Sequence, residues 1–237
     1  MSTWPTHLWV ADEVLERLPQ LHRRGFCVGS IAPDCNVENA DWTVFTPPRQ
    51  MTHWMGSQRK VLSDCDRFWE EYAAPRYAKA STQEERSFLL GYYAHLLVDA
   101  LYQQMIRDEE RVKATWRRIK AHPVLSLQSD GMPETYDSIK PLLPKHERLK
   151  DVEAIEAVYL ANHPQSAFVT EILPLQDFPD YLDFLPQGAI VRKISVMGRM
   201  PAAEEGREFI AIFLEEYHGF VKAAVELVTA SVASKMA

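Results

Sequence analysis

The stretch FLLGYYAHLLVDALY, residues 88–102, contains only two side chains that ionise near neutral pH, His95 and Asp99. Its length and its apolar character predict a helix in the core of the protein. Aspartate is almost never fully buried without a partner, because an unpaired carboxylate away from water costs several kcal/mol or takes up a proton. A partner is therefore needed to keep Asp99 charged.

The composition is that of an ordinary globular protein. The chain has 237 residues, of which 46% are hydrophobic and 25% are charged, and nine are glycine. Few glycines, no clear alternation of hydrophobic and polar residues, and many apolar residues three or four apart predict an all-α fold. We expect a single helical domain over residues 1–237.

The charge of the chain argues against nucleic acid as its obligatory partner. The net charge is −7, which gives no general attraction to a phosphate backbone. One local exception is the segment RVKATWRRIKAH, residues 111–122, which carries five basic side chains. Acidic residues precede it, so we interpret it as an ordinary solvated helix face, with a site near an anionic ligand as the alternative.

Sequence features also predict where the protein works. No apolar run approaches the ~20 residues that span a bilayer. The N-terminal segment MSTWPTHLWVADEVLERL has no basic region and meets Asp12 and Glu13 too early for a secretory signal. The three cysteines form no CxxC pair, which fits a reducing compartment. We therefore expect a cytoplasmic protein.

Local signals predict helices and connections in the first third of the chain. Thr6 is a typical N-cap and apolar residues follow it at helical spacing, which predicts a helix over residues 6–18. Residues 26–33, FCVGSIAP, are bounded by glycine and proline and predict an extended or short helical connection. A further helix is expected over residues 57–75.

The remaining elements follow from capping signals and breakers. Residues 81–85, STQEE, open the apolar helix, which we expect to continue to about residue 121. We expect a long loop or a pair of short turns over 122–144, a helix over 150–162, and a long amphipathic helix over 202–234. The aromatic and proline-rich segment 174–201 is interpreted as a packed surface loop, with a cover over a cleft as the alternative.

Five side chains carry the candidate chemistry. His95 and Asp99 are four residues apart on a helix, so both can reach one metal ion. His7, Asp34 and His53 also place an imidazole or a carboxylate beside apolar or rigid neighbours. Singly, each of these three has an ordinary structural interpretation, such as a core histidine or a turn aspartate. Together, three imidazoles and two carboxylates suit zinc and related divalent ions.

Four segments, THLWVADEVLERL, FCVGSIAPDC, THW and FLLGYYAHLLVDALY, resemble the zinc-dependent phospholipase C family over about residues 4–105. The helical fold of this family is shared by single-strand-specific nucleases. The resemblance implies that one zinc ion is bound by Asp34, His53, His95 and Asp99, and a second by His7 together with Asp99. It also implies that Asp34 helps to activate the attacking water, and that the substrate is a small phosphate ester or a phospholipid head group.

The sequence departs from the family pattern at two points. Family members that cleave phospholipid begin with a tryptophan whose terminal amine and carbonyl complete the second site, whereas Trp4 here has three residues before it. Either the Trp4 carbonyl ligates alone, or the second site is weak or empty. The third metal of the family uses an HxxxE pair, and none of the later histidines has glutamate at that spacing. We therefore expect a reduced centre of one or two ions.

Three functions remain open on this sequence. The first is hydrolysis of a phosphate monoester or diester at a zinc centre, which we favour. The second is a nuclease-like phosphodiesterase, for which Trp116 is the only stacking residue within the basic segment. The third is a metal-binding protein of the same fold with little catalysis.

Overall fold

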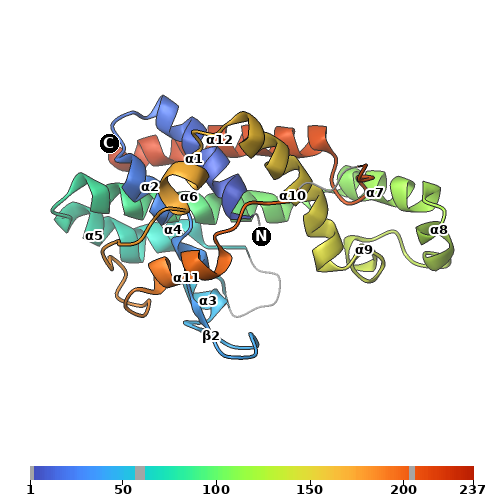
Figure 1. The fold of residues 1–237 in the computed structure, drawn as a ribbon, viewed down its shortest axis with the longest axis horizontal. Coiled ribbons are helices and arrows are strands. Elements are labelled where there is room, and N and C mark those ends of the chain that lie inside the picture. Colours follow the sequence, from blue (N-terminus) through green and yellow to red (C-terminus); the bar gives the residue numbers. More distant parts are fainter. Residues whose placement is uncertain (1–2, 57–61, 203–205) are drawn as a thin grey trace.

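The computed structural model describes residues 3–56, 62–202 and 206–237. These residues are mostly helical, as the sequence predicts, with one antiparallel hairpin in which Val37 pairs with Thr46. Figure 1 shows the arrangement of the elements. Their bounds are α1 Trp4–Arg17, α2 Arg23–Gly29, η1 Ala32–Asp34, β1 Val37–Glu38, β2 Phe45–Thr46, α3 Arg49–Thr52, α4 Cys65–Arg67, η2 Phe68–Ala73, α5 Ala74–Lys79, α6 Gln83–Met105, α7 Glu109–Ala121, α8 Leu125–Gln128, α9 Tyr136–Leu142, α10 Lys145–Asn162, η3 Phe168–Ile172, α11 Ala189–Met197 and α12 Leu214–Met236.

Helix α6 is the centre of the fold and confirms the prediction of a core helix. It begins where the capping signal places it, because the Thr82 side chain accepts a hydrogen bond from the Glu85 amide. Most of its residues from Ser87 to Asp99 are buried. Helices α2 and α12 pack against it, and α1 packs against α12. The polar residues of α6 are thereby enclosed by three neighbouring helices.

Glycines set the distance between α2 and α6, among them Gly29 and Gly91. A Cβ atom on Gly29 would lie 2.1 Å from the carbonyl oxygen of Phe88, and one on Gly91 would lie 2.1 Å from that of Phe26. No other residue fits at such separations, so the two backbones approach closely only because both positions are glycine. This contact holds the C-terminal end of α2 against the middle of α6.

A second hydrophobic cluster lies under α7, α8 and α9, at the right-hand end of Figure 1. Trp116 and Ile119 of α7 are fully buried there, and Ala211 closes the cluster from the segment before α12. The main cluster covers α1, α2, α6 and α12. The single domain expected over residues 1–237 stays a prediction.

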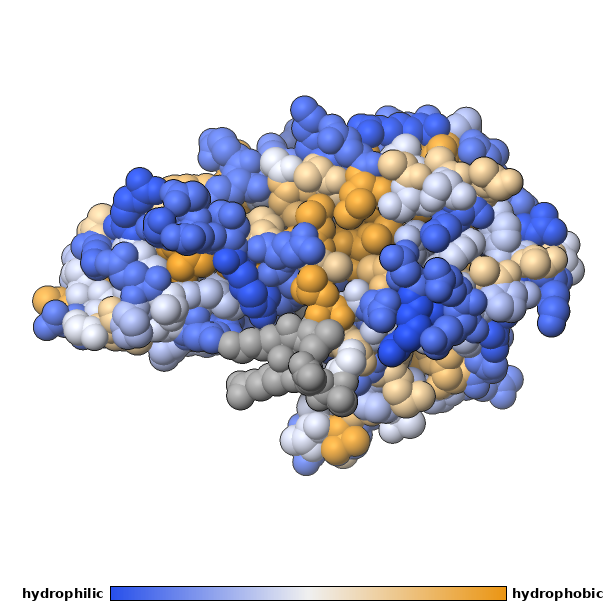
Figure 2. Space-filling model, turned by 180° about the vertical axis from the view of Figure 1, so that it is seen from behind, coloured by the Kyte–Doolittle hydropathy of each residue, from blue (hydrophilic) through white to orange (hydrophobic). Residues whose placement is uncertain are grey.

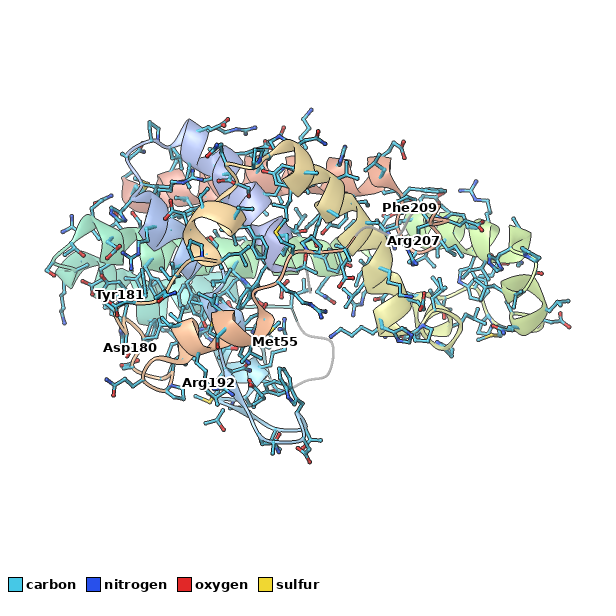
Figure 3. The ribbon with its side chains drawn as sticks, in the orientation of Figure 1. Met55, Asp180, Tyr181, Arg192, Arg207 and Phe209 are labelled. Carbon is cyan, nitrogen blue, oxygen red and sulfur yellow. The ribbon has the colours of Figure 1, made fainter. Side chains whose placement is uncertain are left out.

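The hairpin is anchored to α11 by buried charges. Glu38 of β1 accepts hydrogen bonds from Arg192, labelled in Figure 3, and from Lys193, whose side chain is only 1% exposed. The Lys193 ammonium also lies 5.5 Å from the ring centres of Trp42 and Phe45. Helix α11 was not predicted, since segment 174–201 was interpreted as a loop.

Helix α1 begins earlier than predicted. Its N-cap is Thr3 and not Thr6, and Pro5 lies in the first turn, where its missing N–H costs nothing. The Thr6 side chain donates a hydrogen bond to Glu156 of α10 instead of capping α1. The connection over 26–33 was predicted to be extended or short and helical, and it is short and helical.

Two predictions of helix length were wrong. Helix α6 ends at Met105, and the Asp108 carboxylate accepts a hydrogen bond from the Arg111 amide and begins α7, so no single helix extends to residue 121. The helix predicted over 57–75 begins at Cys65, after an Asp64 cap, and continues to Lys79. Residues 57–61 of that prediction lie outside the described residues.

The later boundaries also shift. The turns expected over 122–144 include two short helices, α8 and α9, and the helix expected from residue 150 begins at Lys145. The last helix begins at Leu214 and not at residue 202. The amides of Ile210, Ala211 and Ile212 donate to the Asp151 carboxylate, which holds this segment out of a helix.

Figure 2 shows the opposite face of the molecule, where hydrophilic side chains surround an apolar area near the centre. Among the described helices, none combines the length and the apolar character that crossing a bilayer requires. Cys27, Cys35 and Cys65 are all free thiols. The cytoplasmic location expected from the sequence stays a prediction.

Candidate metal centre

The five residues singled out in the sequence come together at one place. His7 lies on α1, Asp34 ends η1, His53 follows α3, and His95 and Asp99 lie on α6. Their ligand atoms form two groups, His7 with His95 and Asp99, and Asp34 with His53 and His95. Within each group, all ligand atoms lie within 4.8 Å of one another. His95 belongs to both groups, so the two potential sites adjoin.

The orientation of His95 is fixed by the close contact between α2 and α6. Its Nδ1 lies 2.8 Å from the carbonyl oxygen of Ser30, at the end of α2. A carbonyl oxygen only accepts hydrogen bonds, so Nδ1 carries the proton and donates it. In the neutral ring, Nε2 is then unprotonated and points into the cluster, as in metal-binding histidines that are held by a backbone carbonyl.

His53 is held in the same way by its own turn. The Thr52 hydroxyl donates to the Arg49 carbonyl oxygen and lies 2.9 Å from Nδ1 of His53. When Nδ1 of His53 donates to Thr52, Nε2 is left without a proton and is free to bind a metal ion. The next residue, Trp54, has a φ of 52°, a conformation that a non-glycine residue rarely adopts and that concentrates at functional sites.

These orientations bring the Nε2 atoms of both rings together. The Nε2 atoms of His53 and His95 are 3.3 Å apart, and Nε2 of His53 is also 3.3 Å from Asp34 Oδ1 and 3.5 Å from Asp99 Oδ2. Two unprotonated nitrogens at this distance repel unless a proton or a metal ion lies between them. Ligands ~2.0–2.1 Å from a tetrahedral zinc ion are roughly 3.3–3.4 Å apart. The donor set and its spacing therefore fit a zinc ion.

His7 completes the second group. Its ring stacks on that of His95 with centroids 3.8 Å apart, and its Nε2 lies 3.7 Å from Asp99 Oδ1. Burial, followed by the neighbouring His95, lowers the pKa of His7 well below its usual value. Burial likewise lowers the pKa of His95. Both imidazoles are thus neutral near pH 7, which is the form that binds metal.

The two carboxylates are ionised in spite of their burial. Burial raises the pKa of Asp34, but His53, His95 and Arg49 outweigh it and hold that pKa well below the ordinary value. Burial also raises the pKa of Asp99, and the histidines around it contribute to a net pKa below its ordinary value. Two negative charges therefore face the imidazoles.

Arg49 is a charged residue of this cluster that the sequence did not predict. One guanidinium nitrogen donates to Asp34 Oδ1 at 3.1 Å, and another donates to Asp99 Oδ2 at 2.7 Å. Arg49 opens α3 and lies four residues before His53, so one turn of helix brings both side chains to the carboxylates. That spacing was the available signal, although an arginine in a proline-rich loop is usually a surface residue.

Two cavities open onto the cluster. One, of about 270 Å³, is lined by Asp99, Arg49 and Lys145 among others, and also by Met55, which Figure 3 labels. The other, of about 230 Å³, is lined by Asp34 and Lys145. Trp4 and Met197 also line the second cavity, so the end of segment 174–201 borders the cleft. Both carboxylates are thus reachable from outside.

The basic segment 111–122 lies apart from these cavities and only partly matches its prediction. Lys113 is solvated and pairs with Glu109 and Glu110, as expected of a surface helix face. Arg118, however, binds Glu216 and the carbonyl oxygen of Ile210. Trp116 is fully buried and donates to the Thr135 carbonyl oxygen, so it offers no face for stacking a base.

Comparison with known families agrees with this geometry. The family model described as zinc dependent phospholipase C matches residues 6–102. Over these residues, the chain is similar to the zinc-dependent phospholipase C family. All five candidate ligands lie within the matched range. No curated protein and no solved structure matches the chain.

The segment that matches the zinc-dependent phospholipase C model ends within α6, at Tyr102. Helices α7 to α12 lie beyond it, but they contribute to the surroundings of the site. Lys145 of α10 lines both cavities, and Met197 of α11 lines one of them. The matched segment therefore carries the candidate ligands, and the remaining chain shapes the access to them.

Proposed function

We propose that this protein is a metal-dependent phosphoric-ester hydrolase of the phospholipase C type, with a centre of one or two zinc ions. His7, Asp34, His53, His95 and Asp99 would hold the metal, and other divalent ions of similar preference would also fit. The observation that carries the proposal is the pair of inward Nε2 atoms of His53 and His95, 3.3 Å apart and beside two carboxylates. Similarity to the family over residues 6–102 supports the reaction class.

Metal ions in such a centre polarise phosphoryl oxygens and lower the pKa of a bound water toward neutrality. The residues of the chain would supply the rest. Asp34 lines the smaller cavity and is positioned to accept a proton from a water molecule there. Arg49 lines the larger cavity, where its guanidinium would stabilise negative charge on phosphoryl oxygens.

The substrate is proposed to be a small phosphate ester or a phospholipid head group. Two cavities of about 230 and 270 Å³ adjoin the carboxylates, close to the ~300 Å³ lower end of small-molecule sites. Nucleic acid is not favoured, because burial removes Trp116 as a stacking platform. Incubation with single-stranded DNA would separate a nuclease from a hydrolase of small esters.

The test begins with elemental analysis of protein purified without added metal, followed by reconstitution with zinc. The reconstituted protein is assayed with bis(p-nitrophenyl) phosphate, p-nitrophenyl phosphate and phosphatidylcholine. We expect turnover that a chelator abolishes and that zinc restores. If the zinc-loaded protein hydrolyses none of these substrates, the enzymatic proposal fails.

A second candidate function is a metal-binding protein with little catalysis, and Arg49 is the observation that favours it. Its guanidinium pairs with both Asp34 and Asp99, so the carboxylates have a partial counter-charge without metal. Asp34→Asn separates the two candidates. In a hydrolase, this change should reduce turnover far more than metal content, whereas in a structural site metal content and thermal stability should fall together.

A further inference from the structure

The cavity beside Asp99 is unusually rich in cations for a chain with net charge −7. Arg49, Lys145 and Arg148 line it, and Asp99 is its one acidic lining residue. Arg49 is paired with that carboxylate. Within the part of the chain that the structure describes, no carboxylate pairs with Lys145 or Arg148. About two positive charges at this cavity therefore lack an acidic partner.

Arg148 is held in position to bind an anion. Its Nε donates to the Leu143 carbonyl oxygen at 2.9 Å, and one terminal nitrogen donates to the Tyr136 hydroxyl at 3.2 Å. These bonds fix the guanidinium while its other terminal nitrogen still has donors to offer. A guanidinium fixed in this way binds a phosphate group with little loss of side-chain entropy.

Tyr136 adds a donor to the same cavity. Its hydroxyl oxygen accepts the hydrogen bond from Arg148, which leaves the hydroxyl proton to be donated to a ligand. Arg107 and Lys140 lie 5.1 Å and 4.9 Å from the centre of its ring. These two nearby positive charges make this donor stronger toward an anion.

We propose that this cavity binds a second phosphate group of the substrate, separate from the phosphate that is hydrolysed. A phosphomonoester carries about −1.5 to −2 charges at pH 7, which matches the unpaired charge of Lys145 and Arg148. A cationic head group such as choline would be repelled there. The inference rests on the proposed function for the place of the reacting phosphate, and it predicts a preference for phosphate esters whose head group is itself phosphorylated.

Binding to the full-length, metal-free protein tests the cavity without relying on hydrolysis. Inositol 1-phosphate and inositol 1,4-bisphosphate differ by one phosphate, and calorimetry measures the dissociation constant of each. We expect the bisphosphate to bind about tenfold more tightly, as a charged hydrogen bond implies. Lys145→Gln should remove most of this difference. Lys150→Gln, on the same helix but away from the cavity, should preserve it.

Equal affinity of the wild type for the two probes, or a preference that survives Lys145→Gln, would overturn the inference. Kinetics with zinc-loaded protein then distinguish a failure of the second phosphate site from a failure of the proposed hydrolase function. Dioctanoyl phosphatidylinositol and its 4-phosphate serve as the substrates. Hydrolysis of both with equal kcat/KM would leave a hydrolase without the second phosphate site. A binding preference without hydrolysis of either would leave the site and remove the hydrolase.

Discussion

Nε2 of His53 and Nε2 of His95 lie 3.3 Å apart, although 42 residues separate the two histidines in the chain. Each ring is oriented by a hydrogen bond at its other nitrogen, from α6 to the end of α2 in one case and within the turn after α3 in the other. This arrangement costs free energy unless a proton or a metal ion lies between the nitrogens. The metal-binding predictions follow from it.

His53→Ala should weaken metal binding without unfolding the protein. The change removes one member of the group with Asp34 and His95, and leaves the group of His7, His95 and Asp99. We expect zinc affinity to fall by at least ~10–100-fold. Removing a residue that only supports a metal ligand already has an effect of this size. Metal content by mass spectrometry after equilibrium dialysis measures this. His146→Ala, whose side chain is 73% exposed, is the matched control, and equal metal content in both variants would contradict the prediction.

Arg49→Gln should destabilise the metal-free protein more than the zinc-loaded protein. Without metal, Asp34 and Asp99 lose the counter-charge that the guanidinium provides. Since Arg49 is about one-third exposed, we expect a loss of roughly 1–3 kcal/mol, below that of a fully buried pair. Zinc should reduce the loss, because bound cations replace the missing charge.

Urea denaturation of both variants, with and without zinc, measures the free energy of unfolding in each state. Arg17→Gln is a suitable control, because Arg17 makes only an exposed pair with Glu13 and should change stability by less than about 1 kcal/mol. An identical loss for Arg49→Gln with and without zinc would show that metal does not reach these carboxylates.

Gly91→Ala should disrupt the contact between α2 and α6. The added Cβ would lie 2.1 Å from the Phe26 carbonyl oxygen, so the helices must separate. We expect destabilisation of roughly 1–3 kcal/mol or more, together with weaker zinc binding, because Ser30 orients His95 from the end of α2.

Gly219→Ala should have the opposite effect on the stability of the protein. Gly219 lies within α12, and an added Cβ atom there would meet nothing within 4 Å, so alanine should stabilise the helix by about 0.5–1 kcal/mol. Thermal unfolding distinguishes the two. If both glycine variants behave alike, the close approach at Gly91 has no energetic importance.

Glu156 should make the stability of the protein depend on pH. Burial raises the pKa of its carboxyl group from 4.5 to about 7, although the Thr3 and Thr6 hydroxyls donate to it. The folded state therefore binds the proton more tightly than the unfolded state. The resulting stabilisation is complete below about pH 4.5 and is lost as the pH rises through 7.

Glu156→Gln does not ionise, so it should be more stable than the wild type at pH 8, by up to roughly 3 kcal/mol, and similar to it at pH 4.5. Denaturant titrations across this pH range measure the difference. The exposed Glu16 on α1 offers the control variant, Glu16→Gln, measured over the same pH range. A pH-independent difference for Glu156→Gln would place the pKa of this group elsewhere.

The candidate ligands were predictable from sequence because each contradicts its local surroundings. Asp99 and His95 interrupt an apolar run, and His7 lies on the inward side of the first helix. Such positions are costly unless a partner exists, so the sequence itself marks them. Arg49 carries no such mark, since an arginine is ordinarily exposed. Only the fold brings it to Asp34 and Asp99, 15 and 50 residues away.

The helix boundaries show a similar limit. The apolar residues before α12 recur at helical spacing, yet the Asp151 carboxylate accepts the amides of Ile210, Ala211 and Ile212. This acceptor lies on α10, about 60 residues away in the chain, so no local pattern reports it. The cationic cavity has the same origin, because Arg49 and Arg148 meet there from distant helices.

The sequence alone thus determined the helical class and the five side chains of the candidate centre, because burying a charge or an imidazole is costly enough to leave a local pattern. The tertiary structure decided the counter-charge from Arg49, the late start of α12 and the cations of the cavity. These depend on contacts between residues far apart in the chain, whose free energy arises only when the helices pack.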